Sequence, residues 1–315
     1  MSLKKSLLVL FAVFLLAGCE QQPALPEPPP IQTLYAGKPF TIGILPEQNV
    51  FEQRKRYHQL GEYLTQALRR PVKIKLLDSY SHVGIAKELE EDIIDAAFFG
   101  SYIYALTYQQ GLIEPIARPV DTEYGAEYRG VIFTRPETGV TSDVTTWVGK
   151  RIALVHHANT AGYLFPRWYL HQSYSGDYHA YFERILFLGS HDATVLAVHS
   201  KHADIGAAKE SIVNRMMQQN ADIAASLTII ASGEISVPTN TLAVRNDLDT
   251  ALKQQIETAL LDMHLSDAGQ QALKALGAER FIRTEDHEYD ALRYIMREME
   301  LFNEPLTRID SIAKP

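Results

Sequence analysis

The stretch Phe40-Thr41-Ile42-Gly43-Ile44-Leu45 is a short apolar run, and residues 51–69 after it repeat apolar residues with the period of a helix. A run of this length and composition is typical of a buried strand. In the segment that follows, Leu60, Leu64 and Leu68 fall on one helical face. The folded part of the chain therefore begins with a strand and then a helix, the unit from which α/β sheets are built.

The same alternation continues along the chain. Short apolar runs predict strands at residues 72–77, 96–99, 151–155, 185–188, 204–208, 227–231 and 241–244. Amphipathic stretches predict helices at residues 83–89, 101–110, 160–171, 192–199, 209–218, 248–265, 267–276 and 286–302. Regular alternation favours sheets of mostly parallel strands with helices on both faces. Because the pattern restarts at residue 151, the predicted fold class is α/β with two lobes.

The N-terminus indicates where the protein works. Lys4 and Lys5 precede the ten-residue apolar run Leu7–Leu16, which is too short to cross a bilayer and is typical of a secretory signal. Leu16-Ala17-Gly18-Cys19 resembles a bacterial lipobox, which implies cleavage after residue 18 and acylation of Cys19. Several acyl chains would anchor the protein firmly in a membrane. We therefore expect a signal peptide over 1–18 and a lipoprotein on the periplasmic side, in the outer membrane if the cell is Gram-negative.

Composition narrows the class of protein further. Residues 19–33 contain five prolines and few large apolar residues, as expected of an extended tether. Cys19 is the only cysteine, so no intramolecular disulfide can form. The formal charge of −8 becomes −10 once a signal with two lysines is removed. An acidic chain of this kind is not expected to bind nucleic acid, although a local site can still hold a small anion.

Polar or small residues stand at four junctions between a predicted strand and a predicted helix. The junctions are Pro46–Asn49, Gly100–Tyr104, Asn159–Gly162 and Ser190–Asp192. Free N–H groups and the helix dipole favour an anion at such a position, although a single junction of this kind is more often an ordinary helix cap. Four of them converging on one crevice at the carboxyl ends of the strands favour a ligand site.

Motifs of catalysis and of metal binding are weak in this sequence. The adjacent His156 and His157 would point to opposite faces of a strand, and His199 with His202 flanks a break in a predicted helix. The sequence contains no nucleophile elbow, P-loop, dinucleotide fingerprint or zinc-protease motif. We therefore expect no catalytic residue, no metal ligand and no cofactor.

Taken in order, several motifs resemble the phosphate/phosphite/phosphonate-binding family of periplasmic proteins that serve ABC transporters. The resemblance covers nearly all of the predicted folded body. It rests on residues 41–46, on 95–100 followed by Tyr104, on Tyr128 with 131–133, on 149–153, on Thr160 with Gly162, on 189–192 and on 204–207. It implies a two-lobed clamp with two crossover strands. The expected lobes are residues 34–133 with 237–315, and residues 134–236.

The resemblance also implies the ligand contacts. In that family an aromatic residue, a Ser-Thr-Ser-Gly helix start and a Ser-His pair contact the anion, and Tyr104, Thr160 and His191 stand at the matching positions. Asn159 and Ala161 replace the two serines, which removes a hydroxyl donor and points to a different or less highly charged anion. The complete set of candidate ligand-binding residues is Gln48, Ser101, Tyr104, Asn159, Thr160, Ala161, His191 and Glu210.

The function expected from these observations is capture of a small oxyanion for an ABC transporter by a lipid-anchored solute-binding protein. Its partners would be the anion, the membrane and the transporter permease. The altered helix start leaves open a sensing subunit of the same fold that serves a membrane histidine kinase or cyclase. A metal-handling or hydrolytic lipoprotein is a second alternative.

Overall fold

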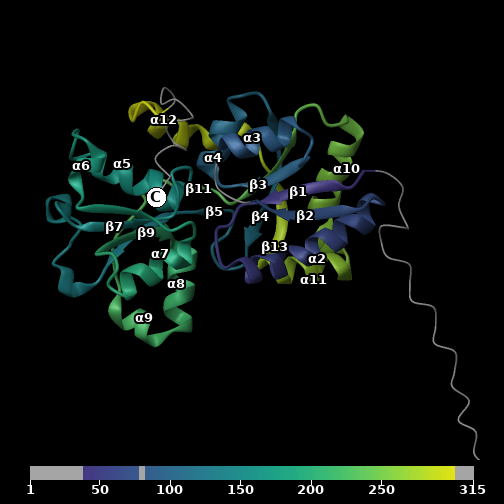
Figure 1. The fold of residues 1–315 in the computed structure, drawn as a ribbon. Helices are drawn as coiled ribbons and strands as arrows, with labels where there is room; N and C mark the ends of the chain where they lie inside the picture. The colour runs from purple at the N-terminus through teal and green to yellow at the C-terminus, as the bar shows by residue number, and fades with distance from the viewer. Residues whose placement is uncertain (1–37, 78–81, 302–315) are drawn as a thin grey trace, which may run out of the picture.

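The computed structural model describes residues 38–77 and 82–301, which form two lobes, each built on its own sheet (Figure 1). The predicted signal, Cys19 and the tether lie outside the described residues. In this part of the chain no helix is both long and apolar enough to cross a membrane.

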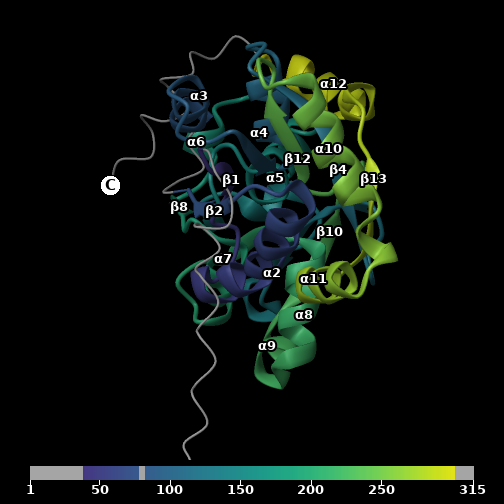
Figure 2. The ribbon, with the colours of Figure 1, turned by 90° about the vertical axis from the view of Figure 1, so that its right-hand side faces the viewer.

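The first lobe contains a six-stranded sheet. In pairing order its strands are β13 (Ala278–Arg283), β4 (Ile113–Asp121), β12 (Thr241–Arg245), β3 (Ala96–Phe99), β1 (Phe40–Ile44) and β2 (Val72–Leu76). Its helices are α2 (Val50–Leu68), α3 (His82–Glu90), α4 (Ser101–Tyr108), α10 (Thr250–Leu261) and α11 (Asp267–Leu276). Figure 2 shows α2 and α11 together on one side of this sheet, while α3 and α4 lie on the other.

The second lobe contains a five-stranded sheet. In pairing order its strands are β10 (Thr228–Ser232), β6 (Gly130–Thr134), β9 (Ile205–Lys209), β7 (Arg151–Leu154) and β8 (Arg184–Phe187). Its helical segments are η1 (Pro136–Thr138), η2 (Val144–Trp147), the π-helical turn η3 (Thr160–Leu164), α5 (Phe165–His171), α6 (Tyr178–Tyr181), α7 (His191–His199), α8 (Glu210–Gln219) and α9 (Ala221–Ser226).

Helix ends follow local chemistry, and helix faces follow the apolar pattern. The Asn49 side chain accepts the N–H groups of Phe51 and Glu52 at the start of α2. Leu60 and Leu64 on this helix are fully buried against strand β1, in the core that also contains α10 and α11. The predicted strand and helix at residues 40–69 are thus confirmed as β1 and α2.

The predicted α/β class, with helices flanking each of two sheets, is confirmed. Within each sheet, antiparallel pairs interrupt the parallel arrangement that the alternation of strands and helices led us to expect. In the first lobe β1, β2 and β3 are parallel, whereas β12, β4 and β13 pair antiparallel. In the second lobe β7, β8 and β9 are parallel, whereas β6 pairs antiparallel with both of its neighbours, β9 and β10. The reason is that β6 and β12 are entered from the other lobe. When the chain comes from the cleft, it enters the sheet at the edge where the parallel strands end. The strand that it then forms runs in the direction opposite to those strands.

The two chain crossings lie side by side between the lobes. They are β5 (Glu127–Tyr128) and β11 (Val237–Pro238), which pair antiparallel in a small sheet of their own (Figure 1). The predicted boundary after residue 133 therefore falls inside β6, because β6 belongs to the second sheet. The predicted boundary after residue 236 directly precedes β11.

The chain returns to the first lobe, and its last described residues lie beside the junction of the lobes. The short helix η5 (Asp286–Tyr289) leads into α12 (Asp290–Glu298), which packs on α4. Leu292 and Ile295 of α12 also line a cavity with Leu164 and Phe165 of the second lobe. Helix α12, the last one among the described residues, thus contacts both sides of the junction.

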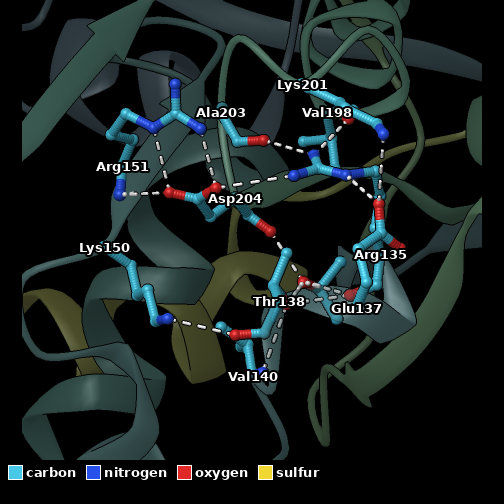
Figure 3. Close-up of polar contacts among 11 residues, drawn as sticks. Arg135, Glu137, Thr138, Val140, Lys150, Arg151, Val198, Lys201, Ala203 and Asp204 are labelled. Atoms are coloured by element: carbon cyan, nitrogen blue, oxygen red, sulfur yellow. Dashed lines mark hydrogen bonds and ion pairs between the residues drawn. The ribbon is translucent and has the colours of Figure 1, made fainter.

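A polar cluster holds the second lobe together at the end of its sheet remote from the first lobe (Figure 3). The buried Arg135 guanidinium donates to the carbonyl oxygens of Val198 and Ala203, the latter at 2.6 Å. Arg151 donates twice to Asp204, at 3.0 and 2.8 Å, which holds the pKa of that carboxyl below its usual range. The cluster ties the ends of β6 and α7 to the start of β7.

Replacing Arg135 by leucine is expected to lower the free energy of unfolding by about 2 kcal/mol, because two buried carbonyl groups lose their donor. Urea denaturation followed by circular dichroism measures this change. Ligand affinity is expected to stay within twofold of wild type, since Arg135 lies at the opposite end of the strands from the cleft. An unchanged urea midpoint would show that the cluster is not important for stability.

Candidate functional site

Loops from both lobes meet at the carboxyl ends of the parallel strands. The first lobe contributes Glu47 after β1 and the start of α4, and the second contributes η3, the start of α7 and the end of β9. Direct hydrogen bonds cross the junction: the N–H of His191 donates to the carbonyl of Glu47 at 3.1 Å, and the N–H of Tyr102 donates to Oγ1 of Thr160 at 2.9 Å. These contacts define the site that we call the inner cluster: Glu47, Tyr102, Tyr128, Asn159, Thr160, His191, Lys209 and Asn240.

The start of η3 is shaped by Asn159 and Gly162. Oδ1 of Asn159 accepts the N–H of Gly162 at 2.6 Å, so the asparagine side chain caps this helical turn. A Cβ at Gly162 would lie 2.3 Å from Cγ2 of Val155, so only glycine lets the turn approach the end of β7 this closely. Since Oδ1 is used in the cap, the Nδ2 group of Asn159 faces His191.

His191 is fully buried as a neutral imidazole. Its Nδ1 accepts the backbone N–H of Lys209 at 3.1 Å, so the ring proton resides on Nε2. Burial, together with the charges of Lys209 and Arg215, lowers the pKa of His191 to about 3. Nε2 lies 3.4 Å from Nδ2 of Asn159, which can only donate. Two donors thus stand side by side, an arrangement that suits a shared acceptor oxygen.

Glu47 is a buried acid that sequence analysis missed. Only 7% of the residue is exposed, and its Oε2 accepts from Nδ2 of Asn240 at 2.7 Å. Its other oxygen faces Gly100 at the N-terminus of α4, where a Cβ would lie 3.6 Å away. The first lobe therefore supplies a carboxylate to the inner cluster, next to a helix dipole that favours negative charge.

Lys209 and Tyr128 complete the inner cluster. The Lys209 ammonium lies 4.2 Å from the centre of the Tyr128 ring, and burial lowers the pKa of this lysine. Burial raises the pKa of Tyr128 to about 12, against hydrogen bonds to Thr160 and Ser101 that lower it. Tyr128 keeps its proton at neutral pH, so the cluster contains a lysine side chain and a neutral phenol close to the Glu47 carboxylate.

The structure brings together most of the residues predicted from the sequence. Asn159, Thr160 and His191 belong to the inner cluster, and Ser101 lies beside it, where its hydroxyl donates to the carbonyl of Pro238 at 2.9 Å. The buried Ala161 follows Thr160 and lines an apolar cavity with it.

The other predicted residues lie elsewhere. Gln48 lines a separate, larger cavity at the mouth of the cleft. The Tyr104 hydroxyl donates to Asp286 at 3.0 Å, and its ring packs 4.1 Å from that of Tyr289, so it faces η5 rather than the inner cluster. Glu210 lines a shallower cavity with Arg129 and Ser236.

Within residues 38–77 and 82–301 no three His, Cys, Asp or Glu side chains gather as a metal ion requires. The inner cluster instead combines hydrogen-bond donors with the single carboxylate of Glu47, and its residues come from two lobes joined by a pair of crossing strands. This fold and this site define a class: two-lobed α/β binding proteins that enclose a small ligand between their lobes. The chain belongs to the family described as ABC transporter, phosphonate, periplasmic substrate-binding protein, whose model matches residues 42–289.

Individual relatives agree with this assignment. The phosphate-import protein PhnD of Mycolicibacterium smegmatis is 24% identical over 204 residues, which is 62% of this chain and 63% of that protein, less than two thirds of its length. The probable ABC transporter phosphite binding protein PhnD1 of Prochlorococcus marinus is 22% identical over 271 residues, covering 83% of this chain and 90% of that protein.

Solved structures show the same fold. PhnD1 of Prochlorococcus marinus in complex with methylphosphonate gives a TM-score of 0.73 at 20% identity, over 84% of this chain and 98% of that one. A binding protein component of an ABC phosphonate transporter from Pseudomonas aeruginosa gives a TM-score of 0.74 at 17% identity, over 87% of this chain and 98% of that one. The family is one of periplasmic substrate-binding proteins of transporters rather than of enzymes.

Proposed function

We propose that this protein captures a small phosphorus oxyanion, of the phosphate, phosphite or phosphonate type, between its lobes and delivers it to an ABC transporter permease. The observation that carries the proposal is the pair of donors at His191 and Asn159. Nε2–H of His191 and Nδ2 of Asn159 lie 3.4 Å apart in a buried place, close enough for one oxygen beside the pair to accept from both. An anionic oxygen accepts from two such donors better than any neutral group does.

The nearby cation and the hinge support the same proposal. Lys209 offsets the charge of an anion held by His191, because the backbone of the lysine binds the ring of this histidine directly. The crossing strands β5 and β11 form a short pivot between the lobes. We propose that the second lobe comprises residues 129–236 and rotates about this pivot when ligand is bound or released.

A thermal-shift and calorimetry panel tests the proposal. Phosphate, phosphite, methylphosphonate and sulfate are each titrated into the protein, and a ligand at 100 times its Kd is expected to add about 2.7 kcal/mol of stability. Stabilisation by at least one phosphorus oxyanion supports the proposal, and no response to any of the four overturns it.

Replacing His191 by alanine is expected to weaken binding of the responding oxyanion about tenfold, since one hydrogen bond to a charged group is lost. His202→Ala is the matched control, because His202 is exposed beyond the other end of the same helix, and it is expected to leave the Kd unchanged. Equal affinities in wild type and His191→Ala would remove His191 from the ligand site.

We further propose that the protein is tethered to a bacterial membrane through acylated Cys19. The family supports a periplasmic location, and the lipobox-like residues 16–19 support the anchor. Cys19→Ser is expected to move the protein from the membrane pellet to the soluble fraction. A version that begins at Leu34 is expected to keep the melting temperature of the full chain. Membrane retention of Cys19→Ser would exclude the lipid anchor.

A further inference from the structure

A second cavity lies next to the inner cluster, at the mouth of the cleft, and has a volume of about 740 Å³. Both lobes contribute to it: Arg56 comes from α2 and Arg215 from α8. Lys209 connects the two sites, because it lines this cavity while its backbone N–H binds His191. A molecule held at the inner cluster can therefore extend into this second cavity.

The two arginines share one neutral acceptor. Oε1 of Gln48 accepts from Nη2 of Arg215 at 2.8 Å and from Nη1 of Arg56 at 3.4 Å. A single amide oxygen bridges two guanidinium groups and carries no charge to neutralise them. Among the described residues neither arginine forms an ion pair within 4 Å. Burial and the charge of Arg56 lower the pKa of Arg215, as expected for like charges held together.

Four acids, Glu52, Asp121, Glu123 and Asp192, also line this cavity, and among the described residues none of them forms an ion pair within 4 Å with either arginine. Asp121 accepts the backbone N–H groups of Glu123 and Tyr124 at 2.9 and 3.1 Å, so its carboxylate stabilises its own turn. Asp192 lies at the N-terminus of α7. Asp121 and Asp192 interact with Arg215 only by long-range electrostatic attraction. Nη2 of Arg56 also donates to the carbonyl oxygen of Leu276. The remaining N–H groups of the pair are donors that a carboxylate or phosphoryl group would bind in paired hydrogen bonds.

We propose that Arg56 and Arg215 form a second anion subsite, which selects ligands with two anionic groups. One group would lie at the inner cluster, and the other, a carboxylate or a second phosphoryl group, would displace Gln48 between the arginines. The proposal rests on the proposed function for the first group. It deepens that function by naming a substrate class: phosphonates or phosphate esters with a second acidic group.

The test compares methylphosphonate, with one acidic group, and phosphonoacetate, with two, by calorimetry. Wild type is expected to bind phosphonoacetate at least tenfold more tightly than methylphosphonate. In Arg215→Gln and in Arg56→Gln that preference is expected to disappear, while the Kd for methylphosphonate changes less than threefold. Lys274→Gln, which removes an exposed cation from the same cavity, is expected to keep the preference.

The outcomes separate this inference from the proposed function. If wild type binds both compounds equally, or if the arginine variants keep the preference, the second subsite is excluded and the proposed function stands. If wild type binds phosphonoacetate in an arginine-dependent way but no single oxyanion, the subsite stands and the inner site fails. Binding of neither compound overturns the subsite. Melting temperatures of the variants confirm that each one is folded.

Discussion

Acidification from pH 7 to pH 4.5 is expected to lower the free energy of unfolding by about 5 kcal/mol, chiefly because of two buried histidines. His157 and His191 are each 1% exposed, and burial lowers the pKa of each to about 3. In the unfolded chain a histidine titrates near its ordinary value of about 6.5. Below that pH the unfolded state binds protons that the native state excludes. Each histidine then lowers the free energy of unfolding by about 1.4 kcal/mol for every pH unit.

The surroundings of the two rings explain why their charged forms are excluded. The ring of His157 lies 3.7 Å from that of Phe187, and its Nε2 has no hydrogen-bond partner among the described residues. Nδ1 of His191 is occupied by the N–H of Lys209. Asp204 also destabilises the native state as the pH falls, at a more acidic pH than the histidines. Its ionised form stabilises the native state, and this contribution is lost as the pH falls through its lowered native pKa.

Urea denaturation at half-unit steps between pH 7 and pH 4.5 measures this effect. His157→Phe is expected to remove about half of the slope, since a phenyl ring fits the aromatic pocket and does not titrate. His58→Gln, which changes an exposed histidine of α2, is expected to leave the slope as in wild type. A free energy of unfolding that stays constant down to pH 5 would show that the native state accepts these protons.

Apolar runs and periodicity in the sequence predicted strands and helices whose formation depends on neighbouring residues. Runs such as residues 40–45 and 96–99 are strands because apolar side chains of this density need burial on both faces. Strand β4 (Ile113–Asp121) was missed because Pro115 and Pro119 interrupt it, and proline is unfavourable in a paired strand. Strand direction was missed because it depends on which lobe the chain comes from, a property of the whole path.

The candidate site shows the same division between local and long-range information. Asn159 and His191 were predicted because each stands at a helix start, which a sequence signals locally. Tyr104 lies on the predicted helix, yet the side to which it points is set by Asp286, 182 residues later in the chain. Glu47 stands inside the predicted junction 46–49 but was not chosen as a candidate, because its burial depends on Asn240, 193 residues away. Contacts at such separations leave no trace in a local pattern.

Replacing Glu47 by glutamine is expected to strengthen binding of methylphosphonate about 100-fold. The Glu47 carboxylate shares the inner cluster with the donors proposed to hold the ligand, so its negative charge opposes that of the anion. At a separation of about 5 Å and an effective dielectric constant of 20, two unit charges repel by about 3 kcal/mol. Glutamine keeps the oxygen that accepts from Asn240, and it removes only the charge.

Calorimetry on wild type, Glu47→Gln and Glu52→Gln measures this effect. Glu52 is an exposed acid at the cleft mouth, so its substitution is expected to change the Kd less than twofold. If only Glu47→Gln binds methylphosphonate more tightly, then the negative charge of Glu47 lowers the affinity for anions in the wild-type protein and speeds ligand release. A loss of binding in Glu47→Gln would contradict this, because it would mean that the carboxylate accepts a hydrogen bond from the P–OH group of methylphosphonate.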